Sequence, residues 1–81
     1  MAASFNTDLI KRSYSNIKLE AMNDGIHWAF TPMLDVSRDP RWGRVIESPG
    51  EDPYVGERFA TAVVEGIQGD DLSKQKNLIA C

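Results

Sequence analysis

The sequence from Phe30 to Tyr54 reads FTPMLDVSRDPRWGRVIESPGEDPY, and the rest of the chain is arranged around this stretch. It begins with apolar residues and then becomes dense in arginines, acids, glycines and prolines. Proline restricts the backbone, glycine allows tight turns, and charged side chains need partners or water. We therefore expect the end of a strand that runs into a long, ordered loop with a functional role.

A helix is predicted before this stretch, from Asn6 to Asn23. Asn6 or Thr7 can cap it, and Gly25 suits the left-handed position that often follows a helix. The spacing of threes and fours predicts one modestly apolar face, made of Leu9, Ile10, Ser13, Ile17 and Ala21.

A second helix is predicted after the stretch, from Pro53 to Gln68. Asp52 is a good capping residue, and proline is favoured at the first helical position. Gly66 and Gly69 mark its end. The apolar face expected for this helix comprises Val55, Phe59, Ala62, Val63, Gly66 and Ile67.

Two short strands are predicted, from Ile26 to Phe30 and from Leu78 to Cys81. In both, the side chains that would point to each face of the sheet are mostly apolar, which favours parallel strands buried on both faces. Trp28 is then expected in the core. His27 stands alone without other metal ligands, so a core histidine is expected there rather than a metal site. Cys81 is expected to be a small buried residue.

The expected order is helix, strand, loop, helix, strand, which points to an α/β fold with a parallel sheet and crossover helices. Two strands buried on both faces cannot be covered by two helices alone. We therefore expect a fragment of a larger α/β domain. The chain has 81 residues, mixed charges and a net charge of −3, which argues against nucleic acid or an anionic membrane as the main partner. No apolar run reaches the roughly 20 residues of a membrane span, and no signal peptide is visible.

The loop carries the residues most suited to chemistry, because sites in parallel α/β folds form at the carboxyl ends of the strands. Arginine donates through a rigid fork that suits carboxylates, phosphates and vicinal hydroxyls. Arginine, aspartate and an aromatic ring together suit a sugar. The alternative is that the charges pair with one another and hold the loop rigid, and we favour this for Arg41, Glu47 and Glu51. Asp39 before Pro40 is expected only to set a turn.

Two strings in this loop, RDPRWGR from Arg38 to Arg44 and GEDPY from Gly50 to Tyr54, resemble glycoside hydrolase family 3, in its β-glucosidase and β-xylosidase branch. The strand end from Phe30 to Val36, Glu47 and the segment from Gly66 to Gly69 also fit. The resemblance implies that residues 1–81 form about a third of an N-terminal (β/α)8 barrel, with no complete second domain. The remainder of the barrel and a C-terminal α/β sandwich domain would be its partners in the full-length protein.

The implied activity is that of a retaining, exo-acting β-glycosidase, which removes terminal non-reducing β-D-glucosyl residues without a cofactor or metal. Arg44 resembles the family's substrate-binding arginine and is expected to be the main contact with a small carbohydrate, with Asp35 and Trp42 as further candidates. For Trp42 a place in the loop core is the favoured alternative. The nucleophile and the acid/base are not expected in this chain, so the isolated chain should be inactive.

Three alternatives remain: a β-xylosidase, an N-acetylhexosaminidase of the same family, and a non-catalytic binding module. The RDPRWGR string speaks against the hexosaminidase.

Overall fold

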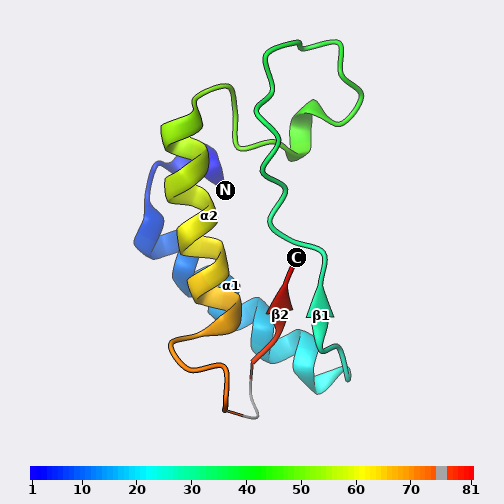
Figure 1. The fold of residues 1–81 in the computed structure, drawn as a ribbon, viewed down its shortest axis with the longest axis vertical. Coiled ribbons are helices and arrows are strands. Elements are labelled where there is room, and N and C mark those ends of the chain that lie inside the picture. Colours follow the sequence, from blue (N-terminus) through cyan, green and yellow to red (C-terminus); the bar gives the residue numbers. More distant parts are fainter. Residues whose placement is uncertain (75–76) are drawn as a thin grey trace.

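The computed structural model describes residues 1–74 and 77–81. Within this part of the chain the order of elements is a short 3-10 turn η1 (Ala2–Ser4), helix α1 (Thr7–Asn23), strand β1 (Trp28–Ala29), a 3-10 turn η2 (Val45–Glu47), helix α2 (Pro53–Gln68) and strand β2 (Ile79–Ala80). The two helices lie along one side of the strands, and the long segment between β1 and α2 extends beyond one end of them (Figure 1). Neither helix is long and apolar enough to cross a membrane, as far as the described residues go.

Helix α1 ends at the predicted residue, Asn23, and begins at Thr7, one residue after the predicted start. The side chain of Asn6 caps it, because Oδ1 of Asn6 accepts a hydrogen bond from the backbone N–H of Leu9 at 2.9 Å. Asp8 lies in the first turn, where a negative charge is favourable. After the helix ends at Asn23, Gly25 takes a positive φ of 80°, a conformation that glycine adopts without steric cost. Local capping signals therefore set both ends.

Helix α2 has its predicted bounds and supplies most of the core. Oδ1 of Asp52 accepts hydrogen bonds from the backbone N–H groups of Tyr54, at 2.8 Å, and Val55, at 3.3 Å. Pro53 follows in the first turn, as predicted. The buried residues of this helix are Phe59, Ala62, Val63, Gly66 and Ile67. They pack with Ile10 of α1 and Leu78 beside β2, which confirms the predicted apolar face of α2.

The two helices come into close contact at Gly66. A Cβ atom placed there would lie 2.7 Å from the backbone oxygen of Lys11 and 2.8 Å from Cβ of Tyr14. Beside this contact, the hydroxyl of Ser15 lies 3.0 Å from the backbone oxygen of Lys11 and 3.3 Å from that of Gly66. An ion pair between Lys11 and Glu65, at 3.0 Å, lies at the rim. The absence of a side chain at Gly66 therefore sets the distance between the helices.

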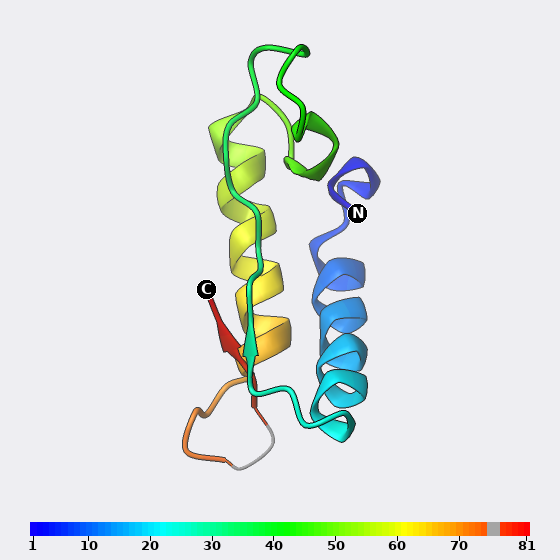
Figure 2. The same cartoon turned by 90° about the vertical axis from the view of Figure 1, so that its right-hand side faces the viewer.

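The strands form a parallel pair with α2 as the connection between them, as predicted. Trp28 lies opposite Ile79, and Ala29 lies opposite Ala80. The backbone N–H of Ile79 donates to the carbonyl of His27 at 3.0 Å, and that of Cys81 donates to the carbonyl of Ala29 at 3.1 Å. Figure 2 shows β1 and β2 running in the same direction, with β1 in front of α2 and α1 to one side.

The prediction that this sheet is buried on both faces is wrong for the described residues. Ala29 and Ala80 pack against the core, so the alternation of the strand places Trp28 and Phe30 on the opposite face. There Trp28 is 57% exposed and Phe30 is 82% exposed, and their ring centroids are 5.0 Å apart. The physical reason is that the core packs on the face that carries Ala29 and Ala80, and within residues 1–74 and 77–81 no further layer packs on the other face.

Three further burial predictions are corrected. His27, which precedes β1, and Cys81, which follows β2, are exposed rather than buried, because the strands are short and neither residue packs on the core. On α1, Leu9 is 51% exposed and Ile17 is 40% exposed. The residues of α1 that pack on the core are Ile10, Tyr14, Ala21 and Met22. Ile10 and Ala21 of the predicted face are therefore confirmed, and the contact between α1 and Gly66 turns Tyr14 rather than Leu9 or Ile17 toward α2.

The total exposed surface agrees with these observations. The chain exposes 5907 Å². A compact monomer of 9.0 kDa would expose about 4,900 Å². The apolar face of the sheet is part of the excess, so this chain offers more uncovered apolar surface than a compact protein of its size.

Candidate functional site

The segment between β1 and α2 lies at the carboxyl ends of the strands. The arrows of β1 and β2 both point toward the end of the molecule that carries this segment (Figure 1). It includes η2 and leads into the first turn of α2. Side chains at this end of a parallel sheet are those that build sites in α/β proteins. The polar residues predicted as site candidates therefore lie at the expected end.

Arg44 and Glu47 form a two-point ion pair across η2. The Nε–H of Arg44 donates to Oε1 of Glu47 at 2.9 Å, and Nη2 donates to Oε2 at 2.7 Å. Both side chains are partly exposed, at 60% for Arg44 and 44% for Glu47. The spacing of three residues in a 3-10 turn brings the two side chains to the same side of the turn.

Arg44 and Glu47 each stabilise the charged form of the other, which shifts both pKa values. The hydrogen bond from Arg44 holds the pKa of the Glu47 carboxyl below its ordinary value. In return, the hydrogen bond to Glu47 raises the pKa of Arg44, and the negative charges of Glu47 and then Asp35 raise it further. Asp35 is exposed and acts on Arg44 through its charge. The structure thus brings together Arg44, Glu47 and Asp35, three of the residues singled out in the sequence.

Hydrogen bonds tie η2 to the segment that leaves β1. The hydroxyl of Ser48 donates to the backbone oxygen of Asp35 at 2.7 Å and accepts from the backbone N–H of Gly50 at 3.0 Å. The backbone N–H of Ser37 donates to the carbonyl of Gly50 at 3.0 Å. Gly50 has a φ of 125°, which a residue with a side chain rarely adopts. Ser48 was missed as a site residue because its partner lies 13 residues away.

Arg41 pairs with Asp39 rather than with a distant acid. Its Nε donates to Oδ1 of Asp39 at 3.0 Å, and its Nη2 donates to Oδ2 at 2.7 Å. The pKa of Asp39 is lowered by this side-chain bond and by the bond from the backbone N–H of Arg41. Asp39 was expected only to set a turn, and its spacing of two residues from Arg41 is the signal that could have identified the pair.

Two other candidates lie apart from these pairs. Glu51 makes no ion pair with any residue of the described ranges, and it lines a shallow hollow of about 240 Å³ with Arg38, Val45 and Gly50. Trp42 is exposed, at 36%, and does not take the place in the loop core that was expected for it. Its carbonyl accepts from the backbone N–H of Val45 at 3.0 Å, which forms the turn before η2.

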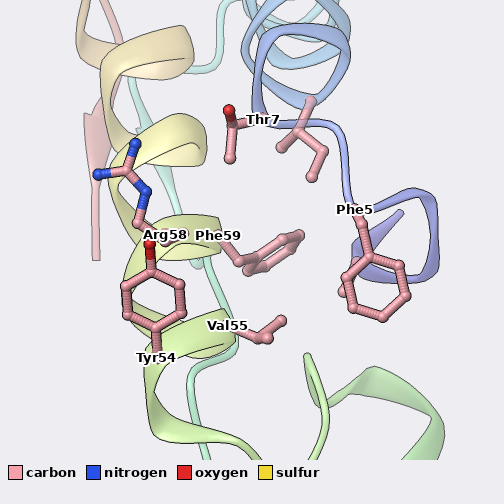
Figure 3. A pocket seen from close by; sticks show the side chains of 8 residues that line it. Phe5, Thr7, Tyr54, Val55, Arg58 and Phe59 are labelled. Carbon is pink, nitrogen blue, oxygen red and sulfur yellow. The ribbon is translucent and has the colours of Figure 1, made fainter.

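An apolar hollow of about 220 Å³ lies elsewhere, between η1 and the first turns of α2 (Figure 3). Val55 and Phe59 of α2 point into it, and Phe5 lies across from them. None of the loop residues from Asp35 to Glu47 lines it, so it is separate from the ion-pair cluster. Within residues 1–74 and 77–81, no group of three or more potential ligand side chains could hold a metal ion.

The sequence model of the glycosyl hydrolase family 3 N terminal domain matches residues 1–77. The chain belongs to glycosyl hydrolase family 3. Among the curated family members it matches, a periplasmic beta-glucosidase from Salmonella typhimurium is 42% identical over 69 residues, which cover 85% of this chain and 9% of that protein. An exo-1,4-beta-xylosidase from Emericella nidulans is 40% identical over an alignment of 87 residues. This alignment covers all of this chain and 11% of that protein.

Solved structures of family 3 enzymes show the same fold. The beta-glucosidase from Listeria innocua, solved in complex with glucose, aligns with a TM-score of 0.92 at 43% identity. The alignment covers 99% of this chain and 12% of the Listeria chain. A β-glucosidase from Erythrobacter marinus aligns with the same TM-score at 34% identity, over 98% of this chain and 11% of that one. This chain therefore spans about a tenth of the length of these family 3 relatives.

Proposed function

We propose that this chain is the part of a retaining, exo-acting β-glycosidase that supplies a substrate-binding arginine, Arg44. The substrate would be a terminal β-D-glucosyl residue or a similar neutral sugar. The single observation that carries the proposal is that Arg44 caps η2, within the segment at the carboxyl ends of two parallel strands, in a chain of this family. The names of the relatives support it, because they are β-glucosidases and β-xylosidases.

Residues 1–81 would be part of an N-terminal (β/α)8 barrel domain. The parallel connection from β1 through α2 to β2 is the repeating unit of such a barrel. The uncovered face carries Trp28, Phe30 and Ile79, which are large apolar residues of the kind that fill a barrel interior. Further strands of the barrel would cover this face, and a C-terminal α/β sandwich domain would complete the enzyme.

The hydrogen-bonding capacity of Arg44 suits this role. A guanidinium carries five N–H groups, and Glu47 accepts from two of its nitrogens, Nε and Nη2. Three N–H groups are left to donate, and they form a planar fork that matches vicinal hydroxyls of a sugar. Hydrogen bonds that strengthen as the ring flattens in the transition state would speed the reaction as well as aid binding. Asp35 and Trp42 are the further candidates for sugar contacts.

The bond-breaking groups are proposed to lie outside these residues. Retention requires one carboxylate that attacks the anomeric carbon and a second that protonates the leaving oxygen and later activates water. In the loop, the carboxylates of Asp39 and Glu47 are engaged with arginines, and the resemblance to family 3 implies that both catalytic carboxylates belong to other parts of the enzyme. We accordingly assign neither role to this chain and expect the purified 81-residue chain to leave an aryl β-glucoside unhydrolysed. Measurable turnover by the isolated chain would contradict this assignment.

The proposal can be tested in a chimera in which residues 1–81 replace the matching segment of the Listeria innocua β-glucosidase. We expect the chimera to hydrolyse an aryl β-glucoside. Arg44→Ala should then lower kcat/KM about 10- to 100-fold, because it removes charge-assisted hydrogen bonds to the substrate. Arg41→Ala is the matched control and should change kcat/KM by no more than about twofold, since its pair is local and exposed.

Two results would overturn the proposal. One is a chimera that folds, judged by its circular dichroism and melting temperature, but does not hydrolyse the substrate. The other is an Arg44→Ala chimera with the same kinetics as its parent.

A further inference from the structure

We propose that Glu47 is a positioning residue, whose carboxylate fixes the plane of the Arg44 guanidinium so that a single edge of it faces the sugar. This inference rests on the proposed function, since it concerns the same site. It assigns to Glu47 a part in substrate binding, although Glu47 itself need not touch the substrate.

The first argument is the geometry of the pair. A single hydrogen bond would leave the guanidinium free to rotate about the donor atom. Two parallel bonds, from Nε at 2.9 Å and from Nη2 at 2.7 Å, fix both the direction and the plane of the group. The edge that carries Nη1 is then directed away from Glu47, and this is the edge that can meet two hydroxyls at once.

The second argument is the exposure of the pair. At 60% and 44% exposure, an ion pair of this kind contributes little to the stability of a protein. A flexible arginine, however, loses much rotational freedom when it is ordered by a ligand. When Glu47 orders the arginine beforehand, the sugar does not have to, so the pair has more effect on binding than on folding.

The third argument is the anchoring of Glu47 itself. Its backbone N–H donates to the carbonyl of Arg44 at 3.0 Å within η2. The next residue, Ser48, is bonded to the backbone of Asp35, which follows β1. Glu47 is thus held relative to the strand ends. A carboxylate can only position a partner when it is itself held in place.

The pair of Arg41 and Asp39 provides a comparison within the same loop. It has the same two-point geometry, with bonds of 3.0 Å and 2.7 Å. The Arg41 side chain is 88% exposed, and the residues are only two apart, so their pairing is local. The charge of Asp35 raises the pKa of Arg44 but is not among the causes that raise the pKa of Arg41. The two pairs therefore share their hydrogen-bond geometry but differ in their exposure and in the charges around them.

The test uses the same chimera and the matched variants Glu47→Gln and Asp39→Asn, each of which removes one charge from one pair. Glutamine keeps the shape of Glu47 but offers a single oxygen, so the two-point contact is lost. We expect Glu47→Gln to raise KM and to lower kcat/KM about tenfold, with a melting temperature unchanged within about 2 °C. Asp39→Asn should leave kcat/KM within about twofold.

A double-mutant cycle separates positioning from a structural role. Once Arg44 is alanine, Glu47 has nothing to position, so Glu47→Gln in that background should change kcat/KM less than about twofold. A further tenfold loss in that background would overturn the inference, because Glu47 would then act independently of Arg44. Failure of Glu47→Gln to fold would also overturn it, since Glu47 would then be a structural residue.

The outcomes also distinguish this inference from the proposed function. If Arg44→Ala lowers kcat/KM and Glu47→Gln does not, Arg44 binds substrate without help from Glu47, and only the inference fails. If neither variant has an effect on kcat/KM, the inference and the proposed function both fail. Calorimetric titration of the chimera with glucose gives a second measurement independent of turnover, and Glu47→Gln should weaken glucose binding by about the same factor.

Discussion

Gly66→Ala should destabilise the chain, although alanine is normally the better helix former. Gly66 lies within α2, where replacing glycine by alanine favours the helix by about 1 kcal/mol. Its added Cβ, however, would lie 2.7 Å from the backbone oxygen of Lys11 and 2.8 Å from Cβ of Tyr14. Neither atom can rotate away, because one belongs to the backbone of α1 and the other is attached to it. The helices must therefore move apart.

The expected net effect follows from these two opposing terms. Overpacking in a well-packed interface costs about 1 to 3 kcal/mol. Separating the helices also lengthens the contact between the Ser15 hydroxyl and the carbonyl of Gly66, which is already 3.3 Å. After the gain in helix propensity is subtracted, the free energy of unfolding should fall by up to about 2 kcal/mol.

Gly56 provides a matched control in the same helix. A Cβ at this position would meet only Cγ of Pro49, at 3.8 Å, which is an ordinary contact. Gly56→Ala should therefore raise the free energy of unfolding by about 0.5 to 1 kcal/mol. The measurement is urea unfolding of the 81-residue chain, followed by circular dichroism. Because small proteins have urea m-values of about 1 kcal/mol/M or more, the midpoint of Gly66→Ala should lie below that of Gly56→Ala by up to about 3 M. If Gly66→Ala stabilised the chain as much as Gly56→Ala, the close contact between α1 and α2 would be refuted.

Two further predictions concern a helix cap and a carboxyl group. Asp52→Ala should lower the free energy of unfolding by about 1 kcal/mol in the same urea assay, because the N–H groups of Tyr54 and Val55 lose their acceptor, and an unchanged midpoint would argue against the cap. The pKa of Glu47 is lowered by Arg44, so the pair stabilises the fold above the pKa that Glu47 has when unfolded, and this contribution is lost as the pH falls through the lower, folded pKa. In an NMR titration of the Glu47 carboxyl carbon, Arg44→Ala should raise the midpoint toward the ordinary glutamate value, whereas Arg41→Ala should leave it unchanged.

The helices could be predicted closely because their signals are local. The caps at Asn6 and Asp52 and the glycines that follow each helix fix the ends through hydrogen bonds and φ angles within a few residues. The buried face of α2 was predicted correctly because it is strongly apolar. The face of α1 was predicted only in part, since its pattern is weak: Ile10 and Ala21 pack on the core, whereas Leu9 and Ile17 are exposed.

The sequence by itself determined the order of elements, the parallel pairing and the loop at the carboxyl ends of the strands. Only the tertiary structure decided that Arg44 pairs with Glu47, that Ser48 ties this turn to Asp35, and that one face of the sheet is uncovered. The reason is physical. Helix caps and periodicity depend on neighbours along the chain, whereas an ion-pair partner or a covering layer depends on which residues the folded backbone brings within a few ångströms of each other.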